Sequence, residues 1–246
     1  MRYFIFVFAL IFLASCKKDN AGDDVLIDNG GVEVPPLYIW KPVVGGTPYS
    51  IEEVIVNTTN NYRYFFTDIR ILTTNITAQT ELKGSALFDF AKDHITIAEL
   101  NNNPDMSSIG FNIGVPDSVN HLDPSTHPTN SALNISNASD MHWGWNPGYI
   151  FVKLEGRVDT TDNGIDDFNY AFAYHIGGDD LFKSLSSIVP IKVSGSENYY
   201  NNIELRKLFD DPLSPINLKD KSSTHSSPGD FQFASKLINN LVNAFE

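Results

Sequence analysis

The sequence predicts an all-β protein, an immunoglobulin-like or jelly-roll-like β-sandwich with a short C-terminal helix. Three observations lead to this prediction. Short runs rich in β-branched and aromatic residues follow one another from residue 37 onward, which is typical of strands. Asparagine runs at 60–61, 101–103 and 201–202 separate several of them, and asparagine tolerates the left-handed backbone of turns. Helical periodicity is confined to two segments near the C-terminal end.

Individual strands and helices follow from local patterns. We expect strands at 62–72, 108–115, 149–156, 169–176 and 187–193. Proline cannot donate to a strand ladder, so Val189-Pro190 indicates an edge or a bulge in the last of these. A short helix is expected within 198–211. A longer amphipathic helix is expected over 231–245, with apolar residues three and four apart and Asp230 near its start.

Composition limits the function. The chain has 246 residues, with 17 Lys and Arg against 30 Asp and Glu, for a net charge of −13. Nucleic-acid binding needs a basic face, so this balance excludes a nucleic-acid partner. One cysteine cannot form an internal disulfide or a CxxC zinc site. The body shows no internal repeat and no strong boundary, so we expect one β-sandwich domain over 37–246.

The N-terminal segment has the pattern of a bacterial lipoprotein leader. Arg2 precedes the apolar run 4–13, which is too short for a stable transmembrane helix and fits a signal peptide over 1–15. Leu13-Ala14-Ser15-Cys16 resembles a lipobox, in which the cysteine is acylated and becomes the new N-terminus. The alternative is an ordinary secretory signal with a chance cysteine.

The lipobox resemblance predicts the location of the mature protein. Acyl chains on Cys16 would attach it to a membrane, and residues 16–36 read as a flexible linker. We therefore expect an outer-membrane lipoprotein, either on the periplasmic face or at the cell surface. Lys17-Lys18-Asp19 resembles a surface-export signal of some Gram-negative lipoproteins, and a solvated tether is the equal alternative.

The densest group of unusual residues is the segment 140–151, Asp-Met-His-Trp-Gly-Trp-Asn-Pro-Gly-Tyr-Ile-Phe. It contains His142, Trp143 and Trp145. Two tryptophans this close are most often a core anchor or an aromatic platform. Three further histidines make a metal site a competing interpretation: His121, His175 and His225. Neutral imidazole suits copper and zinc, and distant histidines can converge in a sandwich, although a single histidine is more often structural.

Together these segments resemble a known family. The combination of Gly-Val-Pro-Asp-Ser-Val-Asn-His-Leu-Asp-Pro (114–124), residues 140–156 and Ala-Tyr-His-Ile-Gly-Gly (173–178) resembles the MbnP-like copper-binding proteins, which are related to the MopE and CorA proteins. The resemblance covers most of 48–246. The ordered Trp-x-Trp-x-x-Gly-Tyr-x-Phe element between two histidine motifs is its most specific part.

The resemblance implies an extracytoplasmic copper-binding β-sandwich. In that family a tryptophan can be oxidised to kynurenine by a dihaem partner enzyme resembling MauG, and the product helps to bind the metal. His121 and His175 match the family's histidine motifs. Trp143 or Trp145 matches the modified tryptophan, and the sequence leaves the choice open. His142 stands where relatives often carry an apolar aromatic residue, so it is a candidate extra ligand, as is His225.

One departure from the family pattern concerns the loop after His175. Many relatives have a cysteine there, whereas this chain has Gly178-Asp179-Asp180. The departure removes a disulfide and leaves the loop less constrained. It removes no histidine, so the expectation of copper binding is unchanged.

Other patterns are weaker. The acidic loop 159–167 only partly resembles a calcium site, because it lacks the EF-hand register and the distal glutamate, so calcium is not expected. Asp89, Asp93 and His94 have no partner nucleophile, and the sequence contains no G-x-S-x-G, P-loop or H-E-x-x-H motif. We therefore expect a copper-binding protein that acquires, stores or delivers the metal and is not an enzyme.

The alternative function is a surface module that binds glycan or protein. It would use Trp143, Trp145 and Tyr149 as an aromatic platform. This alternative predicts exposed indole rings and no metal.

Overall fold

The computed structural model describes residues 34–92, 95–144, 148–161, 163 and 165–246. The chain divides into two units, Met1–Val34 and Pro35–Glu246, and the fold below is that of the second. The predicted leader, Cys16 and most of the predicted linker lie outside the described residues, as do Trp145, Asp93 and His94. Within the described ranges, no helix is both long enough and apolar enough to span a bilayer.

The smaller of two sheets has five strands. Its order is β11 (Ile191–Lys192), β12 (Tyr199–Glu204), β1 (Leu37–Val44) and β2 (Thr47–Pro48), and β6 (Thr96–Glu99) also pairs with β1. β1 and β12 run parallel, with Tyr38 opposite Tyr199 and Val43 opposite Glu204. This pairing joins residues that are about 160 positions apart in the sequence, so it is fixed by the tertiary fold and not by local sequence.

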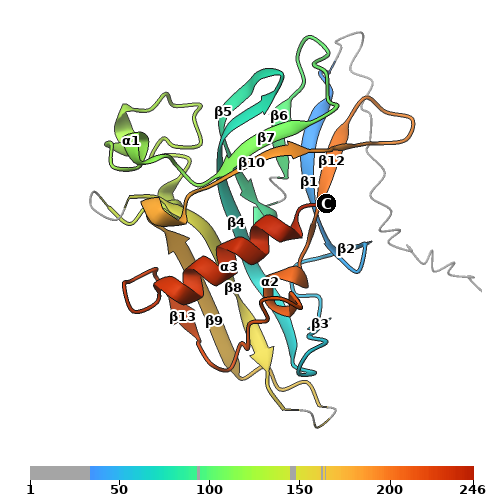
Figure 1. The fold of residues 1–246 in the computed structure, drawn as a ribbon, viewed down its shortest axis with the longest axis vertical. Coiled ribbons are helices and arrows are strands. Elements are labelled where there is room, and N and C mark those ends of the chain that lie inside the picture. Colours follow the sequence, from blue (N-terminus) through green and yellow to red (C-terminus); the bar gives the residue numbers. More distant parts are fainter. Residues whose placement is uncertain (1–33, 93–94, 145–147, 162, 164) are drawn as a thin grey trace, which may run out of the picture. The chain divides into compact units, whose positions relative to one another are not determined.

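The larger sheet has eight strands and carries the candidate site. Its order is β10 (Lys183–Ile188), β7 (Ile109–Ile113), β4 (Arg63–Ala78), β8 (Ile150–Asp159), β9 (Tyr170–Gly177) and β13 (Ser223–Thr224). β3 (Ile55–Val56) and β5 (Thr80–Asp89) pair with β4. Strands make up most of the regular structure and helices are few and short, so the all-β prediction is confirmed (Figure 1).

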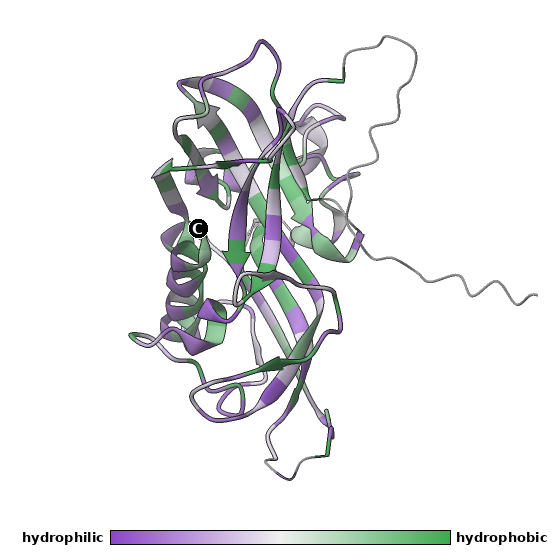
Figure 2. Ribbon diagram, turned by 90° about the vertical axis from the view of Figure 1, so that its right-hand side faces the viewer, coloured by the Kyte–Doolittle hydropathy of each residue, from purple (hydrophilic) through white to green (hydrophobic). Residues whose placement is uncertain are grey.

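The core is rich in aromatic rings because alternate side chains of the strands point to one face. Figure 2 shows hydrophobic and hydrophilic bands alternating along the strands. Trp40 from β1 is fully buried, with Phe111 of β7 4.9 Å away between ring centres. Tyr64, Phe66 and other buried rings extend the same core. Burial of this apolar surface is the main stabilising contribution to the fold.

The C-terminal helix α3 (Phe231–Ala244) packs against this core, as the spacing of its apolar residues predicts. Ala234, Leu237, Ile238 and Leu241 lie on its buried face. Near its start Phe233 contacts Tyr174 of β9, and just past its end Phe245 contacts Trp40 of β1. Figure 1 shows the helix, in red, crossing the strands of the larger sheet. The predicted C-terminal helix is confirmed.

Two local predictions are corrected. Within 198–211 the expected short helix is present but is limited to α2 (Lys207–Asp210), because Tyr199–Glu204 instead forms β12, which pairs with β1. The expected strand at 187–193 is interrupted at Val189-Pro190, where the chain leaves β10 in the larger sheet and enters β11 in the smaller one. The proline therefore marks a change of sheet, which a local pattern does not show.

Ion pairs cross three strands of the larger sheet, β5, β4 and β8, on the face opposite to Ile69 and Ile71. Arg70 Nε lies 3.0 Å from Asp68 Oδ1 and 3.4 Å from Asp89 Oδ2. Lys153 Nζ then connects Asp68 Oδ2, at 3.0 Å, with Glu155 Oε1, at 3.3 Å. The row follows the register, which places Arg70 opposite both Asp89 and Lys153. These charges are largely buried, so each needs its partners.

Candidate metal centre

Three aromatic side chains meet at the end of β9. The rings of His175 and His225 have centres 5.2 Å apart and are nearly perpendicular, at 88°. The ring of Trp143 lies 6.5 Å from that of His225. Strand pairing explains the meeting, because β13 runs parallel to β9 with Thr224 opposite Tyr174. The histidine that follows each of these two residues is therefore brought next to the other.

A glycine makes room for Trp143. A Cβ on Gly177, the last residue of β9, would lie 2.8 Å from Cζ3 of the Trp143 ring and 2.4 Å from the Tyr149 carbonyl oxygen. The indole therefore packs directly on the β9 backbone. The backbone N–H of Trp143 donates to the Gly148 carbonyl at 3.0 Å, which holds the start of the loop near β8. Trp143 is packed against the core and remains partly exposed.

A carboxylate orients the His175 ring. His175 Nε2 lies 2.8 Å from Glu155 Oε1 on the neighbouring strand β8. Partial burial alone would raise the pKa of Glu155, but the bonds from His175 and Lys153 outweigh it and hold that pKa below its usual value. The glutamate is thus charged, and it favours a proton on Nε2. The Nδ1 atom of His175 is then the nitrogen with a lone pair for a metal.

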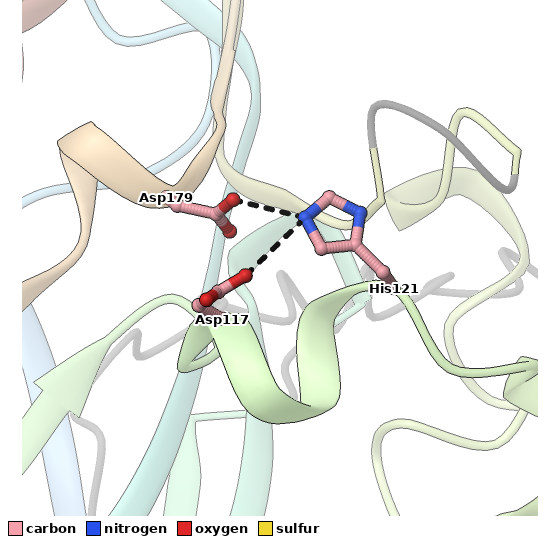
Figure 3. A group of neighbouring side chains, drawn as sticks. All are labelled: Asp117, His121 and Asp179. Atoms are coloured by element: carbon pink, nitrogen blue, oxygen red, sulfur yellow. Dashed lines mark hydrogen bonds and ion pairs between the residues drawn. The ribbon is translucent and has the colours of Figure 1, made fainter.

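His121 lies in a different group, with Asp117 and Asp179 (Figure 3). Its Nε2 is 2.9 Å from Asp179 Oδ2 and 3.7 Å from Asp117 Oδ1. Asp117 and His121 are one turn apart at α1 (Asp117–Asn120), whereas Asp179 begins the short helix η4 (Asp179–Leu181). The three potential ligand atoms lie within 4.8 Å of one another, which makes this the one group of three metal-ligating residues in the described part of the chain.

Asn120 holds the Asp117–His121–Asp179 group in place. Its Nδ2 donates to Asp179 Oδ1 at 2.8 Å, and its Oδ1 accepts from the backbone N–H of Tyr149 at 2.9 Å. Burial raises the pKa of Asp179, but the bonds from His121 and Asn120 have the larger combined effect and lower it. Asp179 follows His175 by four residues, so the two histidine groups lie at the same end of β9.

The ring of His142 accepts a hydrogen bond at Nδ1, which leaves Nε2 as the nitrogen that donates. Its Nδ1 accepts from the backbone N–H of Gly144 at 3.0 Å. Burial lowers its pKa, against the opposing charge of Asp123, so the ring is neutral at neutral pH. A neutral ring that accepts at Nδ1 carries its proton on Nε2. Nε2 is buried without a partner among the described residues, so ligation there would require loss of that proton.

The predicted residues are therefore only partly brought together. His175, His225 and Trp143 share one cluster, His121 joins two aspartates, and His142 packs on Tyr149. The sequence patterns did not identify the carboxylates Glu155, Asp117 and Asp179 as parts of the site. For two of them the sequence offered one indication, a spacing of four residues from a histidine: Asp117 precedes His121 by four residues, and Asp179 follows His175 by four.

The structure also bears on two further features singled out in the sequence, the aromatic platform and the acidic loop 159–167. Tyr149 is fully buried and its hydroxyl donates to the Leu133 carbonyl at 2.5 Å, so its inclusion in an exposed aromatic platform was wrong. In the acidic loop, both carboxylate oxygens of Asp159 are bonded, one to Arg63 at 2.7 Å and one to Thr161 Oγ1 at 2.6 Å. Hydrogen bonds from Thr161, Asp167 and Arg63 lower the pKa of Asp159.

Comparisons with known proteins give one family. The MbnP family model matches residues 40–226. Among solved structures, MbnP from Methylosinus trichosporium is similar, with 15% sequence identity and a TM-score of 0.47. That similarity covers 71% of this chain and 76% of the other. No curated protein matches the chain at a significant level.

Proposed function

The chain belongs to the MbnP family, and from that premise we propose that it is an extracytoplasmic copper-binding lipoprotein that acquires, stores or delivers the metal. The observation that supports this most is the convergence of His175 and His225 beside Trp143. Two neutral imidazoles favour copper over most divalent metals that such a site would meet. Copper would be the cargo of a binding protein and not the cofactor of an enzyme.

The donor set fits copper. We assign His175 and His225 as the first two ligands, because their ring centres are 5.2 Å apart. Glu155 supports the assignment, since a carboxylate on the far nitrogen of a ligating histidine fixes the ring and raises its basicity. His121 has the same arrangement, with Asp179 on its Nε2. It remains a candidate third ligand, as the family resemblance suggests.

Trp143 is our first candidate for oxidation to kynurenine, with Trp145 as the alternative. Oxidation would cleave the indole C2–C3 bond with two oxygen atoms, and hydrolysis would release formate and leave an aromatic amine and a ketone. At Trp143 these groups would form next to His225. A dihaem enzyme resembling MauG would provide the oxidising centre. The indole is partly exposed, which suits an outside oxidant.

Copper titration of the purified protein tests the ligand assignment. We expect His175→Ala and His225→Ala each to weaken copper binding by more than the roughly 100-fold that loss of an outer-shell partner can cost. His121→Ala is the comparison variant. An equal loss places His121 in the same coordination sphere, whereas unchanged affinity separates the Asp117–His121–Asp179 group from copper. Unchanged affinity in both His175→Ala and His225→Ala would contradict the proposal.

Removing the Glu155 carboxylate is a milder change to the same site. Glu155→Gln keeps the shape of the side chain but removes the charge that favours a proton on His175 Nε2. We expect copper affinity to fall by about 10- to 100-fold, with no change in the far-ultraviolet circular dichroism. Glu99→Gln, an exposed change on β6, is the matched control and should leave copper affinity unaltered. Equal affinities of the two variants would argue against an orienting role for Glu155.

Mass spectrometry tests the modification. Co-expression with a dihaem partner should give the kynurenine mass gain on the peptide containing Trp143 and Trp145, and Trp143→Phe should abolish it. A mass gain that persists in Trp143→Phe and is lost in Trp145→Phe would transfer the assignment to Trp145. For the glycan- or protein-binding alternative, the expected results are no copper binding by the wild type and loss of partner binding in Trp143→Ala.

A further inference from the structure

Arg70, Lys153 and His175 lie in register on three neighbouring strands. Arg70 of β4 is opposite Lys153 of β8, and Lys153 is opposite His175 of β9. Residues directly opposite each other on antiparallel strands project to the same face of the sheet and are close neighbours. The larger sheet therefore places a lysine next to a proposed copper ligand, at the end of the row of ion pairs that includes Arg70.

Two carboxylates hold the ammonium group of Lys153. Its Nζ lies 3.3 Å from Glu155 Oε1, the same oxygen that lies 2.8 Å from His175 Nε2. On the other side, Nζ lies 3.0 Å from Asp68 Oδ2. The Lys153 side chain is only 13% exposed, so water and salt screen its charge less than that of a surface lysine. The positive charge is therefore held in a defined position beside the His175 ring.

Lys153 offsets the charge of the carboxylate that orients His175. A carboxylate on the far nitrogen of a ligating histidine raises the basicity of the ring, and it also adds negative charge near the metal. Because Lys153 shares Glu155 Oε1 with His175, both effects are reduced. Asp68 does not restore the negative charge, since Arg70 Nε lies 3.0 Å from Asp68 Oδ1. Glu155 thus keeps the ring in place while adding little net charge.

A fixed positive charge distinguishes between the two oxidation states of copper. The Coulomb energy is proportional to the product of the charges, so the repulsion from Lys153 is twice as large for Cu²⁺ as for Cu⁺. An ammonium group has no lone pair and cannot itself be a ligand. The influence of Lys153 on the site is therefore one of charge, exerted beside and through Glu155.

We propose that Lys153 is a specificity-determining residue, which raises the preference of the copper site for Cu⁺ over Cu²⁺. The inference rests on the proposed copper function, with His175 as a ligand. It gives Lys153 a role distinct from that of its neighbour on the same strand. Glu155 sets the orientation of the His175 ring, whereas Lys153 sets which oxidation state of copper the ring binds better.

Separate titrations with Cu⁺ and Cu²⁺ test the assignment, each in competition with a chelator of known affinity, and the Cu⁺ series in the absence of oxygen. Lys153→Met keeps most of the side-chain length but removes the charge. We expect it to shift the ratio of the two affinities by roughly tenfold toward Cu²⁺. For a one-electron couple this corresponds to a fall of about 59 mV in the reduction potential of the bound copper, which voltammetry measures independently. Lys153→Arg keeps the charge and should keep the wild-type ratio.

Two further variants separate this effect from instability and from net charge. Asp68→Asn removes the negative charge on the other side of Lys153, so it should shift the ratio toward Cu⁺, opposite to Lys153→Met. A general loss of structure does not move the ratio in opposite directions in the two variants. Lys192→Met removes a positive charge from an exposed pair with Glu197, on β11 of the smaller sheet, and should leave the ratio unchanged.

The possible failures are distinguishable. If the wild type binds copper and Lys153→Met has the same ratio of affinities, the role of Lys153 is overturned and the proposed copper function stands. A shift of equal size in Lys153→Arg or Lys192→Met also overturns the inference, since the effect would not come from a charge at Lys153. If the wild type binds neither Cu⁺ nor Cu²⁺, the proposed function is itself contradicted, and this inference with it.

Discussion

Replacing Arg70 by leucine is expected to lower the free energy of unfolding by about 3–5 kcal/mol, the range for removal of one partner from a buried ion pair. Arg70 is 11% exposed in its side chain, and the side chains of Asp68 and Asp89 are 10% and 2% exposed. Leucine fills a similar volume but removes the guanidinium that the two carboxylates share, so that Asp68 keeps only Lys153 and Asp89 only Lys92 as a cationic partner. The loss therefore reflects reduced charge compensation of buried carboxylates more than lost packing.

Urea unfolding measures this effect. Lys192→Leu is the matched control, because it removes a cation from an exposed pair with Glu197, and surface pairs contribute only about 0–1 kcal/mol. Adding Asp89→Leu to Arg70→Leu should recover part of the stability, since one of the two buried carboxylates that lost the guanidinium is then gone. If the urea concentration at the unfolding midpoint is as high for Arg70→Leu as for Lys192→Leu, water must reach these carboxylates and hydrogen-bond to them.

Gly156→Ala is the second change with a large expected effect. Gly156 lies in β8 between β4 and β9, opposite Phe66 and Phe172. An added Cβ would lie 2.1 Å from the Phe65 carbonyl oxygen and 2.5 Å from Cζ of Phe172. The first neighbour is backbone in a central strand, so it cannot move aside. We expect a loss of about 3 kcal/mol or more, the upper part of the range for overpacked cores.

Thermal unfolding of Gly156→Ala and Gly84→Ala separates this clash from the general effect of replacing glycine. Near Gly84 in β5, an added Cβ meets only Glu81 Oε1, at 3.8 Å. The same substitution there should stay within about 0.5 kcal/mol of the wild type. Similar melting temperatures for the two variants would show that β8 shifts to accommodate the methyl group.

Local patterns predicted those parts of the fold that local chemistry decides. The strand expected at 62–72 forms the first part of β4, which begins at Arg63 and continues to Ala78, and the helix expected at 231–245 is α3 almost residue for residue. The segment 198–211 shows where such reasoning fails. Its apolar spacing is compatible with a helix. Six of its residues instead pair with β1, and this long-range pairing determines their structure.

The residues of the candidate site also fall into those that the sequence could identify and those that it could not. Its histidines and tryptophans could be identified because they are rare and occur in recognisable motifs. The carboxylates that orient them could not, since this chain has 30 acidic residues and only strand register shows which of them lie beside a histidine. The Glu155–His175 contact depends on the β8–β9 register, and the His175–His225 contact depends on the β9–β13 pairing.

The parallel pairing of β1 with β12 has a consequence for the order of folding. β1 is among the first parts of this domain to be synthesised, and its partner follows about 160 residues later. Until then one edge of β1 is an open template for other strands. The entropy of closing so long a loop makes the step slow, giving the domain the high contact order of slow folders. A binding factor that shields β1 during synthesis or transport should therefore raise the yield of folded protein.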